Sequence, residues 1–376
     1  GTSGSFANGL DGDGHSLTLH YSDTTTIDGN SVFFNLNDLT SHGPVELGGT
    51  IQTTGNQSYL DTATLINATE IQAAGGSFEG GLVGAGNDLT LNIASTITIE
   101  DGSGVNNLTS TGETILTGTI TTTGSQTYQS NVTIEGDVEL NAGSDVSFSS
   151  EVFGNQNGTA GNPDLIINTQ ADTTFGGTVS DLATLTTDAG GSTIAKADIT
   201  TTGNQTYNDE FVLNTNLTLT GGNASFTAGI DGDGNDLTLN FTGNATLDGG
   251  ATPISGINNL TSLGGIATNG TITTSGAQSF EGNATLIGNT TLVGPSATLA
   301  GTFDGQGHDL TINYTSPTTI SSSGGNITNF TSVGDVLLNT TDFETIGTQT
   351  FQGNVTLTGD TKLTGTSGSF EKGLDG

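Results

Sequence analysis

A five-residue phrase, glycine-x-glutamine-x-aromatic, returns five times along the 376-residue chain and limits its fold more than any other feature. Its glutamines are Gln57, Gln126, Gln205, Gln278 and Gln349, so successive copies lie about 73 residues apart, with some variation. Two other phrases, Gly-x-Gly-(Asn/His)-x-Leu-Thr and Asn-x-Leu-Thr-Ser, recur with some drift at the same interval. Such a period predicts a tandem array of similar modules, not several unrelated domains.

The array divides into five units and the start of a sixth, and we expect one continuous segment over residues 1–376. The expected units are approximately 6–77, 78–147, 148–225, 226–298 and 299–369, followed by 370–376. The first twelve residues read GTSGSFANGLDG and the last twelve read GTSGSFEKGLDG, so both ends have the same phase. Because a terminal repeat is usually atypical, we expect this chain to be part of a longer array.

The chain carries 38 acidic residues against three basic ones, which gives a formal net charge of −35. Nucleic acids and anionic membranes are bound through lysine and arginine, so we expect neither as a partner. The sequence has no cysteine and therefore no disulfide or thiolate metal site. We also expect no membrane insertion, because no run of 18 apolar residues occurs.

Apolar residues alternate with polar ones over short stretches, as in Leu237, Leu239 and Phe241, and glycine, asparagine and aspartate bound these stretches. This pattern predicts short β-strands joined by tight turns. The acidic, glycine-rich composition would also suit a disordered chain, but disorder does not explain an alternation that recurs in every unit.

One unit has too few apolar residues for its seven or eight short strands to close a core of their own, so the stacking of units must supply the core. We therefore expect an all-β, right-handed parallel β-helix, or β-solenoid, in which each strand bonds to its equivalent one coil away. A coil of roughly 18–20 residues would make each unit about four coils. The alternative is a string of separate β-sandwich modules. Variable unit length favours the solenoid, because an insertion such as Asn155 to Pro163 can bulge from one corner.

The phrases ITTTGxQTY and GxGNDLTLN, followed by NNLTSL, resemble the repeats of filamentous-haemagglutinin-like and autotransporter-like bacterial surface proteins. The resemblance covers essentially the whole chain. It implies a β-helical stalk that is secreted or held at the bacterial cell surface, with no catalytic residues. The secretion domain of that group is not in this sequence.

Some corners contain aspartate and glycine in a pattern that resembles calcium loops with oxygen ligands. The calcium candidates are Asp11, Asp13, Asp231, Asp233 and Asp304. Calcium-binding β-rolls repeat their phrase every nine residues, whereas here it comes once per unit, and the second unit reads Val-Gly-Ala-Gly. Plain glycine–aspartate turns are therefore the favoured interpretation, with calcium as the alternative.

Gln57 and Tyr59 share one face of their expected strand, and we expect the glutamine to point inward and bond to corner backbone. Among the histidines, His15 and His308 occupy a slot that other units fill with asparagine, which indicates a corner role. The chain has no arginine and no lysine before Lys196, so a catalytic carboxylate–base site is not expected. We expect no enzymatic activity.

Repetition without a singular site favours a structural stalk of a large extracellular or surface-exposed bacterial adhesin. The alternative is a self-assembling extracellular filament or sheath, because an open solenoid end can pair with a further copy. A third hypothesis is a calcium-stiffened module that binds surface polysaccharide. For the stalk, a host or cell receptor would be bound through regions outside this segment.

Overall fold

The computed structural model describes residues 1–27, 33–155, 161–321 and 323–376. These residues form 49 strands and no helix, and the strands pair in parallel as a β-solenoid of about 18 turns. The expected all-β parallel β-helix is therefore confirmed. Residues 156–160 lie outside the described ranges, and so does the prediction that the insertion Asn155 to Pro163 bulges from a corner.

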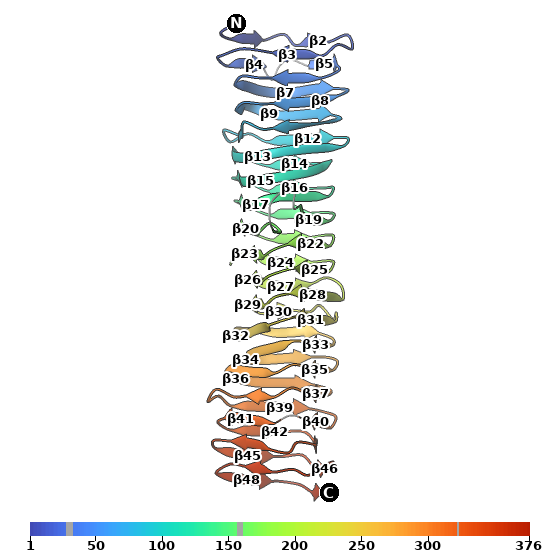
Figure 1. Cartoon of the computed structure of the whole chain (residues 1–376), viewed down its shortest axis with the longest axis vertical. Coiled ribbons are helices and arrows are strands. Elements are labelled where there is room, and N and C mark those ends of the chain that lie inside the picture. The colour runs from blue at the N-terminus through green and yellow to red at the C-terminus, as the bar shows by residue number, and fades with distance from the viewer. Residues whose placement is uncertain (28–32, 156–160, 322) are drawn as a thin grey trace. The chain divides into compact units, whose positions relative to one another are not determined.

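The chain comprises two compact units, Gly1–Gly191 and Ser192–Gly376, each of which contains several of the sequence repeats. In each unit, strands from successive coils lie side by side (Figure 1). A coil has three faces, as β26 (Gln205–Tyr207), β27 (Glu210–Leu213) and β28 (Leu217–Gly221) show. The next strand, β29 (Ala224–Phe226), pairs with β26 and begins the following coil.

Pairing registers give the coil length directly. Leu39 pairs with Gln57, Gln57 with Gly76, Gly76 with Ile97, Ile97 with Thr114 and Thr114 with Val132. These steps average about 19 residues, which agrees with the coil length expected from the sequence. One coil is longer than the others, because the residue that pairs with Val152 in the next coil is Val179.

The length of one repeat is not a whole number of coils. Three turns lead from Gln57 to Thr114, and Gln126 lies two-thirds of the way along the next turn, from Thr114 to Val132. Gln126 itself pairs in another column, with Leu108 and Val146. One repeat therefore takes three and two-thirds turns, close to the expected four. The repeat that begins at Gln57 contains eight strands, β8 to β15, against the seven or eight expected, and the later repeats contain nine or ten in the described residues.

The second unit shows the same phase shift. Gln205 pairs with Ala224, whose column continues through Ala245, Ile266 and Ala284. Gln278 lies two-thirds of the way from Ile266 to Ala284 and pairs with Leu260 instead. Each repeat thus turns its motif by one face of the three-sided coil relative to the repeat before it.

Some strands cover two faces, and a glycine allows the bend between them. β15 (Glu113–Thr122) pairs with β17 (Val132–Ala142) on both faces, with a register shift between Leu116 and Gly118. Gly118 has φ of +69°, a left-handed conformation that a residue with Cβ adopts only with strain. Long strands therefore turn the corner without losing the ladder.

The core is a narrow column of alternating inward side chains. Leu237, Leu239 and Phe241 are all buried, as the alternation predicted, and each such side chain contributes about 1.5–3 kcal/mol through burial. Rings of equivalent strands stack along the column: Tyr128 lies 5.3 Å from Phe148, and Phe148 lies 5.5 Å from Phe175 between ring centroids. Apolar ladders therefore run from coil to coil and not within one repeat.

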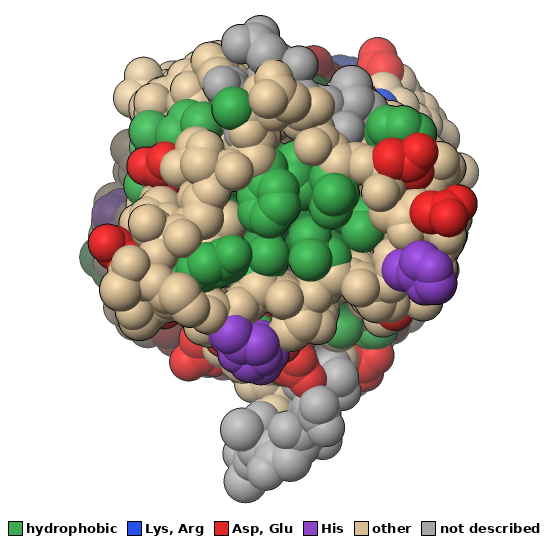
Figure 2. Space-filling view, turned by 90° about the horizontal axis from the view of Figure 1, so that it is seen from above, with side chains coloured by type: hydrophobic (Ala, Val, Ile, Leu, Met, Phe, Trp, Pro, Cys, Tyr) green, Lys and Arg blue, Asp and Glu red, His purple; other side chains and the backbone are tan. Residues whose placement is uncertain are grey.

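The first coil shows how open this column is. β1 (Gly4–Phe6), β2 (Leu10–Asp11) and β3 (Leu17–Leu19) each pair with strands of the following coil. Phe6, Leu10 and Leu17 are only half-buried. Figure 2 shows the resulting apolar patch at the centre of this end, with a polar rim around it.

Candidate functional site

The calcium candidates lie in tight corner turns. Asp231 Oδ1 accepts a hydrogen bond from the backbone N–H of Asp233 at 3.1 Å. Asp11 Oδ1 accepts the same bond from Asp13 at 3.1 Å and another from Asn35 Nδ2 at 3.0 Å. Each candidate pair thus shares one turn.

The second aspartate of each pair occupies a left-handed position, with φ of +48° at Asp13 and +47° at Asp233. Ala85 and Gln306 take the same position in other copies, with φ of +49° and +48°. A position that also accepts alanine is defined by its backbone conformation and not by a carboxylate. Aspartate tolerates this left-handed conformation well.

The glycine inside the turn lets the backbone of the next coil approach closely. A Cβ on Gly232 would lie 2.3 Å from the backbone nitrogen of Ile257 in the next coil. Gly232 N–H also donates to Ser255 O at 2.8 Å, which holds the two coils together there. The Asp-Gly-Asp-Gly phrase therefore fits the geometry of a corner.

The two candidate turns of the second unit do not come together. Asp231 pairs with Ser255, whereas Asp304 pairs with Thr285 and Gly325 in a different column of the same unit. The pKa of Asp304 lies below its ordinary value, because Asn326 and the backbone of Gln306 donate hydrogen bonds to it. Within the described ranges no group of three or more histidines, aspartates and glutamates is arranged to hold a metal ion. Calcium binding at these turns stays a prediction.

Asparagine and aspartate also form ladders along the corners. Asn216 Oδ1 accepts from Asp236 N–H, Asp236 Oδ1 from Asn259 N–H, and Asn259 Oδ1 from Ala277 N–H, each at 2.9 Å. These bonds satisfy backbone donors that have left the strand ladder. They also lower the pKa of Asp236, chiefly through the Asn259 backbone bond.

The glutamine of the five-fold phrase lies at the centre of a buried network. Gln126 is fully buried, and its Nε2 donates to Ile120 O and to Asn141 O, both at 3.1 Å. Its Oε1 accepts a hydrogen bond from the Tyr128 hydroxyl at 3.0 Å. The expected inward glutamine with a backbone partner is confirmed.

The same bonds recur at Gln57 and Gln205, where Tyr59 and Tyr207 donate at 2.7 and 2.9 Å. Burial raises the pKa of each of these tyrosines, so the hydroxyl keeps its proton and remains a donor. The motif is a device that closes a corner of the core, because it joins three consecutive segments of backbone through one side chain.

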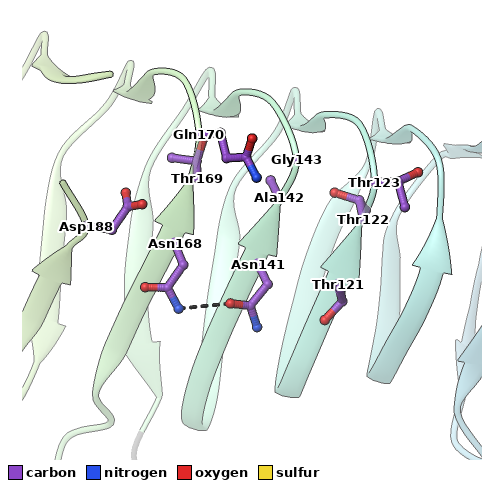
Figure 3. A pocket seen from close by; sticks show the side chains of 10 residues that line it. All are labelled: Thr121, Thr122, Thr123, Asn141, Ala142, Gly143, Asn168, Thr169, Gln170 and Asp188. Atoms are coloured by element: carbon purple, nitrogen blue, oxygen red, sulfur yellow. Dashed lines mark hydrogen bonds between the residues drawn. The ribbon is translucent and has the colours of Figure 1, made fainter. Parts of the chain in front are cut away.

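A shallow polar groove of about 480 Å³ crosses four coils of the first unit. Figure 3 shows Thr121, Asn141 and Asn168 on successive strands, with a hydrogen bond of 2.9 Å from Asn168 Nδ2 to Asn141 Oδ1. These residues lie on β15, β17 and β20 (Leu165–Thr169). The groove is lined by Thr121, Thr122, Thr123, Asn141, Ala142, Gly143, Asn168, Thr169, Gln170 and Asp188.

Most of the lining residues are threonine, asparagine or glutamine, and their hydroxyl and amide groups suit hydrogen bonding to another polar molecule. Asp188 adds one carboxylate, whose Oδ1 has no hydrogen-bond partner in the described part of the chain. No sequence signal singled the groove out, because its members belong to different coils and meet only through the coil length.

In the described residues no helix is long and apolar enough to cross a membrane. Comparisons with protein-family models, with curated proteins and with solved structures give no match.

Proposed function

We propose that this chain is a stalk segment of a large secreted or cell-surface bacterial adhesin, and that it acts as a stiff spacer. The observation that supports this role is the glutamine network, which recurs in both units and joins neighbouring coils each time. The most elaborate buried chemistry of the chain serves the scaffold itself.

Stiffness follows from the pairing. Each coil bonds to the coils beside it through three strands, and a buried column fills the space between them, so bending would break ladders on one side. The net charge of −35 favours separation of neighbouring stalks in solution. The resemblance to filamentous-haemagglutinin-like and autotransporter-like repeats supports a bacterial surface location.

Length is the property to test. Deletion of residues 205–277 removes one repeat, or three and two-thirds turns, and joins Asn204 to Gln278. At about 4.8 Å per turn, the particle should shorten by about 18 Å in small-angle scattering. A compact or disordered particle, or a maximum dimension unchanged by the deletion, would contradict the spacer role.

A capture assay separates a spacer from a binder. The chain is tethered at one end to a surface with a polymer brush, and a small binding domain is fused to the other end. Capture of the target of that domain should fall with the shortened chain and stay unchanged with Asn168→Ala in the groove. Equal capture by the full and shortened chains would exclude a spacing role in this setting.

The second candidate is a self-assembling filament or sheath subunit, in which a further copy would pair with the apolar patch at the first coil (Figure 2). Phe6 and Leu10 are half-buried, whereas Phe78 and Leu82, which take their places one repeat later, are 0% and 2% exposed. A further coil of the same kind, from the same chain or another copy, would cover the patch. Sedimentation at increasing concentration tests this: association that Phe6→Ser abolishes supports a filament, and a monomer throughout contradicts it.

A further inference from the structure

Two histidines of the first unit lie against each other on the outer surface. His20 follows β3, and His42 follows β6 (Leu39–Ser41) in the next coil. Leu19 pairs with Ser41, and His42 N–H donates to Leu19 O at 3.0 Å, so the two histidines occupy equivalent positions. Their imidazole rings are stacked, with centroids 4.0 Å apart and planes 15° from parallel.

The scaffold does not require histidine at either position. In the next repeat the corresponding residues are Asn92 and Thr111, and later repeats place Leu263 and Val333 where His42 stands. His15 differs, because its slot is a corner that asparagine also fills in other repeats. The His20–His42 pair therefore occurs in one repeat only and is not explained by the repeat's own structure.

Both side chains are exposed, and the ladder fixes their backbones one coil apart. Neutral imidazole is the side chain that zinc, copper and nickel ions prefer. Metal–nitrogen bonds are about 2.0–2.1 Å long, so two nitrogens on one ion lie about 3 Å apart. Each ring carries its metal-binding lone pair in the ring plane, so the stacked rings must turn about their side-chain torsions until both nitrogens point at one ion.

The surroundings favour a cation. No lysine or arginine occurs before Lys196, so the whole first unit lacks a basic residue other than histidine. A positive ion bound to two neutral rings on this acidic chain meets attraction from the summed field.

We propose that His20 and His42 form a chelating pair for a divalent transition-metal ion, with copper(II) bound more tightly than nickel(II) or zinc(II). The order follows from the general preference of nitrogen sites among first-row metals. Water completes the coordination, because no third histidine or carboxylate of the described residues is arranged to join a metal site. The site lies on the outer surface, since both side chains are exposed.

The test is a calorimetric titration of the full chain with copper(II), nickel(II) and zinc(II) chloride at neutral pH, in excess calcium to occupy carboxylates. His20→Asn and His42→Thr place at each position the residue that the next repeat carries, so both variants should fold as the parent does. His15→Asn is the matched control, since asparagine fills that slot elsewhere. Circular dichroism checks that all three retain their strand signal.

We expect one copper(II) ion per chain, with affinity reduced about tenfold or more in either pair variant and unchanged in His15→Asn. Electron paramagnetic resonance of the parent should show two equivalent nitrogen ligands, and one in each pair variant. Equal affinity in the parent and the pair variants overturns the proposal. So does an equal loss in His15→Asn, which would indicate diffuse binding to histidines in general.

Discussion

The Tyr314 hydroxyl donates a hydrogen bond to Gln278 Oε1 at 2.7 Å, although the two residues are 36 positions apart. In three other repeats this donor is the tyrosine two residues after the glutamine, but the fourth repeat has Phe280 there. Tyr314 comes from two coils further along and replaces the missing hydroxyl. The acceptor is thus satisfied by a different residue in the same buried position.

A small residue makes room for this ring. Gly294 pairs with Tyr314, and a Cβ on Gly294 would lie 3.4 Å from the Tyr314 ring and 2.7 Å from Thr274 Oγ1. In the second repeat the corresponding residue is Ala142, which pairs with Thr169 and not with an aromatic ring. A glycine at this position therefore accompanies an aromatic residue at the paired position of the next coil.

Tyr314→Phe should lower stability by about 1–3 kcal/mol, because Gln278 Oε1 is left buried without its donor. The double variant Phe280→Tyr/Tyr314→Phe should recover most of this loss, since it restores the arrangement of the other repeats. Urea unfolding followed by circular dichroism gives the midpoints. Tyr21→Phe, at a half-buried tyrosine, is the control and should change little.

Gln126→Leu should lower the free energy of unfolding more, by about 3 kcal/mol or above. The variant no longer donates to two backbone carbonyls, and the Tyr128 hydroxyl loses its acceptor. Because a solenoid can unfold in parts, hydrogen exchange is the sharper measurement. Exchange should accelerate in β16 (Gln126–Tyr128) and in the flanking coils, and not around Gln57. Uniform acceleration over the whole unit would show that the network is not a local closure.

The sequence carries enough information for the inward glutamine and the coil length, since period-two alternation and turn residues are local signals. It does not reveal the pairing of Gln278 with Tyr314, because that contact depends on the lengths of two coils, and these lengths vary along the chain. The phase shift of one face per repeat was missed for the same reason. Spacings between copies give the repeat length but not the number of strands in a coil.

Among the candidate site residues, Asp231 and Asp233 could be placed in a common turn from sequence alone. Their position relative to Asp304 could not be predicted, because the face on which each turn lies depends on the lengths of all the coils between them. The stacking of His20 on His42 was not visible in the sequence either. A whole coil of chain separates the two histidines, and only the register of β3 with β6 makes them neighbours.

Asp236 should make part of the stability dependent on pH. Its pKa in the folded chain lies below the ordinary value of 3.8, so its contribution is present above that value and is lost as pH falls through the folded pKa. Asp236→Asn keeps an Oδ1 acceptor for Asn259 N–H but cannot titrate. The unfolding midpoint of this variant should therefore fall less between neutral pH and pH about 2 than that of the parent.

Asp233→Asn serves as the charge-matched comparison, because it removes one carboxylate from an exposed turn of the same unit. A profile of Asp236→Asn that overlays the parent's would show that the corner bond does not favour the charged form.

Gly232→Ala should destabilise the second unit by about 1–3 kcal/mol, since its Cβ would meet the backbone of Ile257. Asp233→Gly should be neutral or mildly stabilising, because φ of +47° suits glycine better than aspartate. If the corners are plain turns, calcium or a chelator leaves the unfolding temperature of the parent unchanged. A rise with calcium that Asp231→Asn removes would instead establish the calcium site.

Two deletions of very different size provide the strictest test of the repeat. Removal of residues 205–277 takes out one whole repeat and joins Asn204 to Gln278, which then has Ile199 and Thr201 in the places of Ile272 and Thr274. Both acceptors of the glutamine Nε2 that precede it are restored, although everything beyond the join turns by one face.

Removal of residues 266–277 takes out only two-thirds of a turn and joins Gly265 to Gln278, which puts Leu260 and Ser262 in the places of Ile272 and Thr274. This deletion also turns everything beyond the join by one face, so the two deletions share their phase shift and both keep a carbonyl and a hydroxyl before the glutamine. We therefore expect similar urea midpoints for the two deletions. A clearly lower midpoint for the small deletion would mean that the glutamine network needs the residues of a whole repeat before it, and not only its two nearest acceptors.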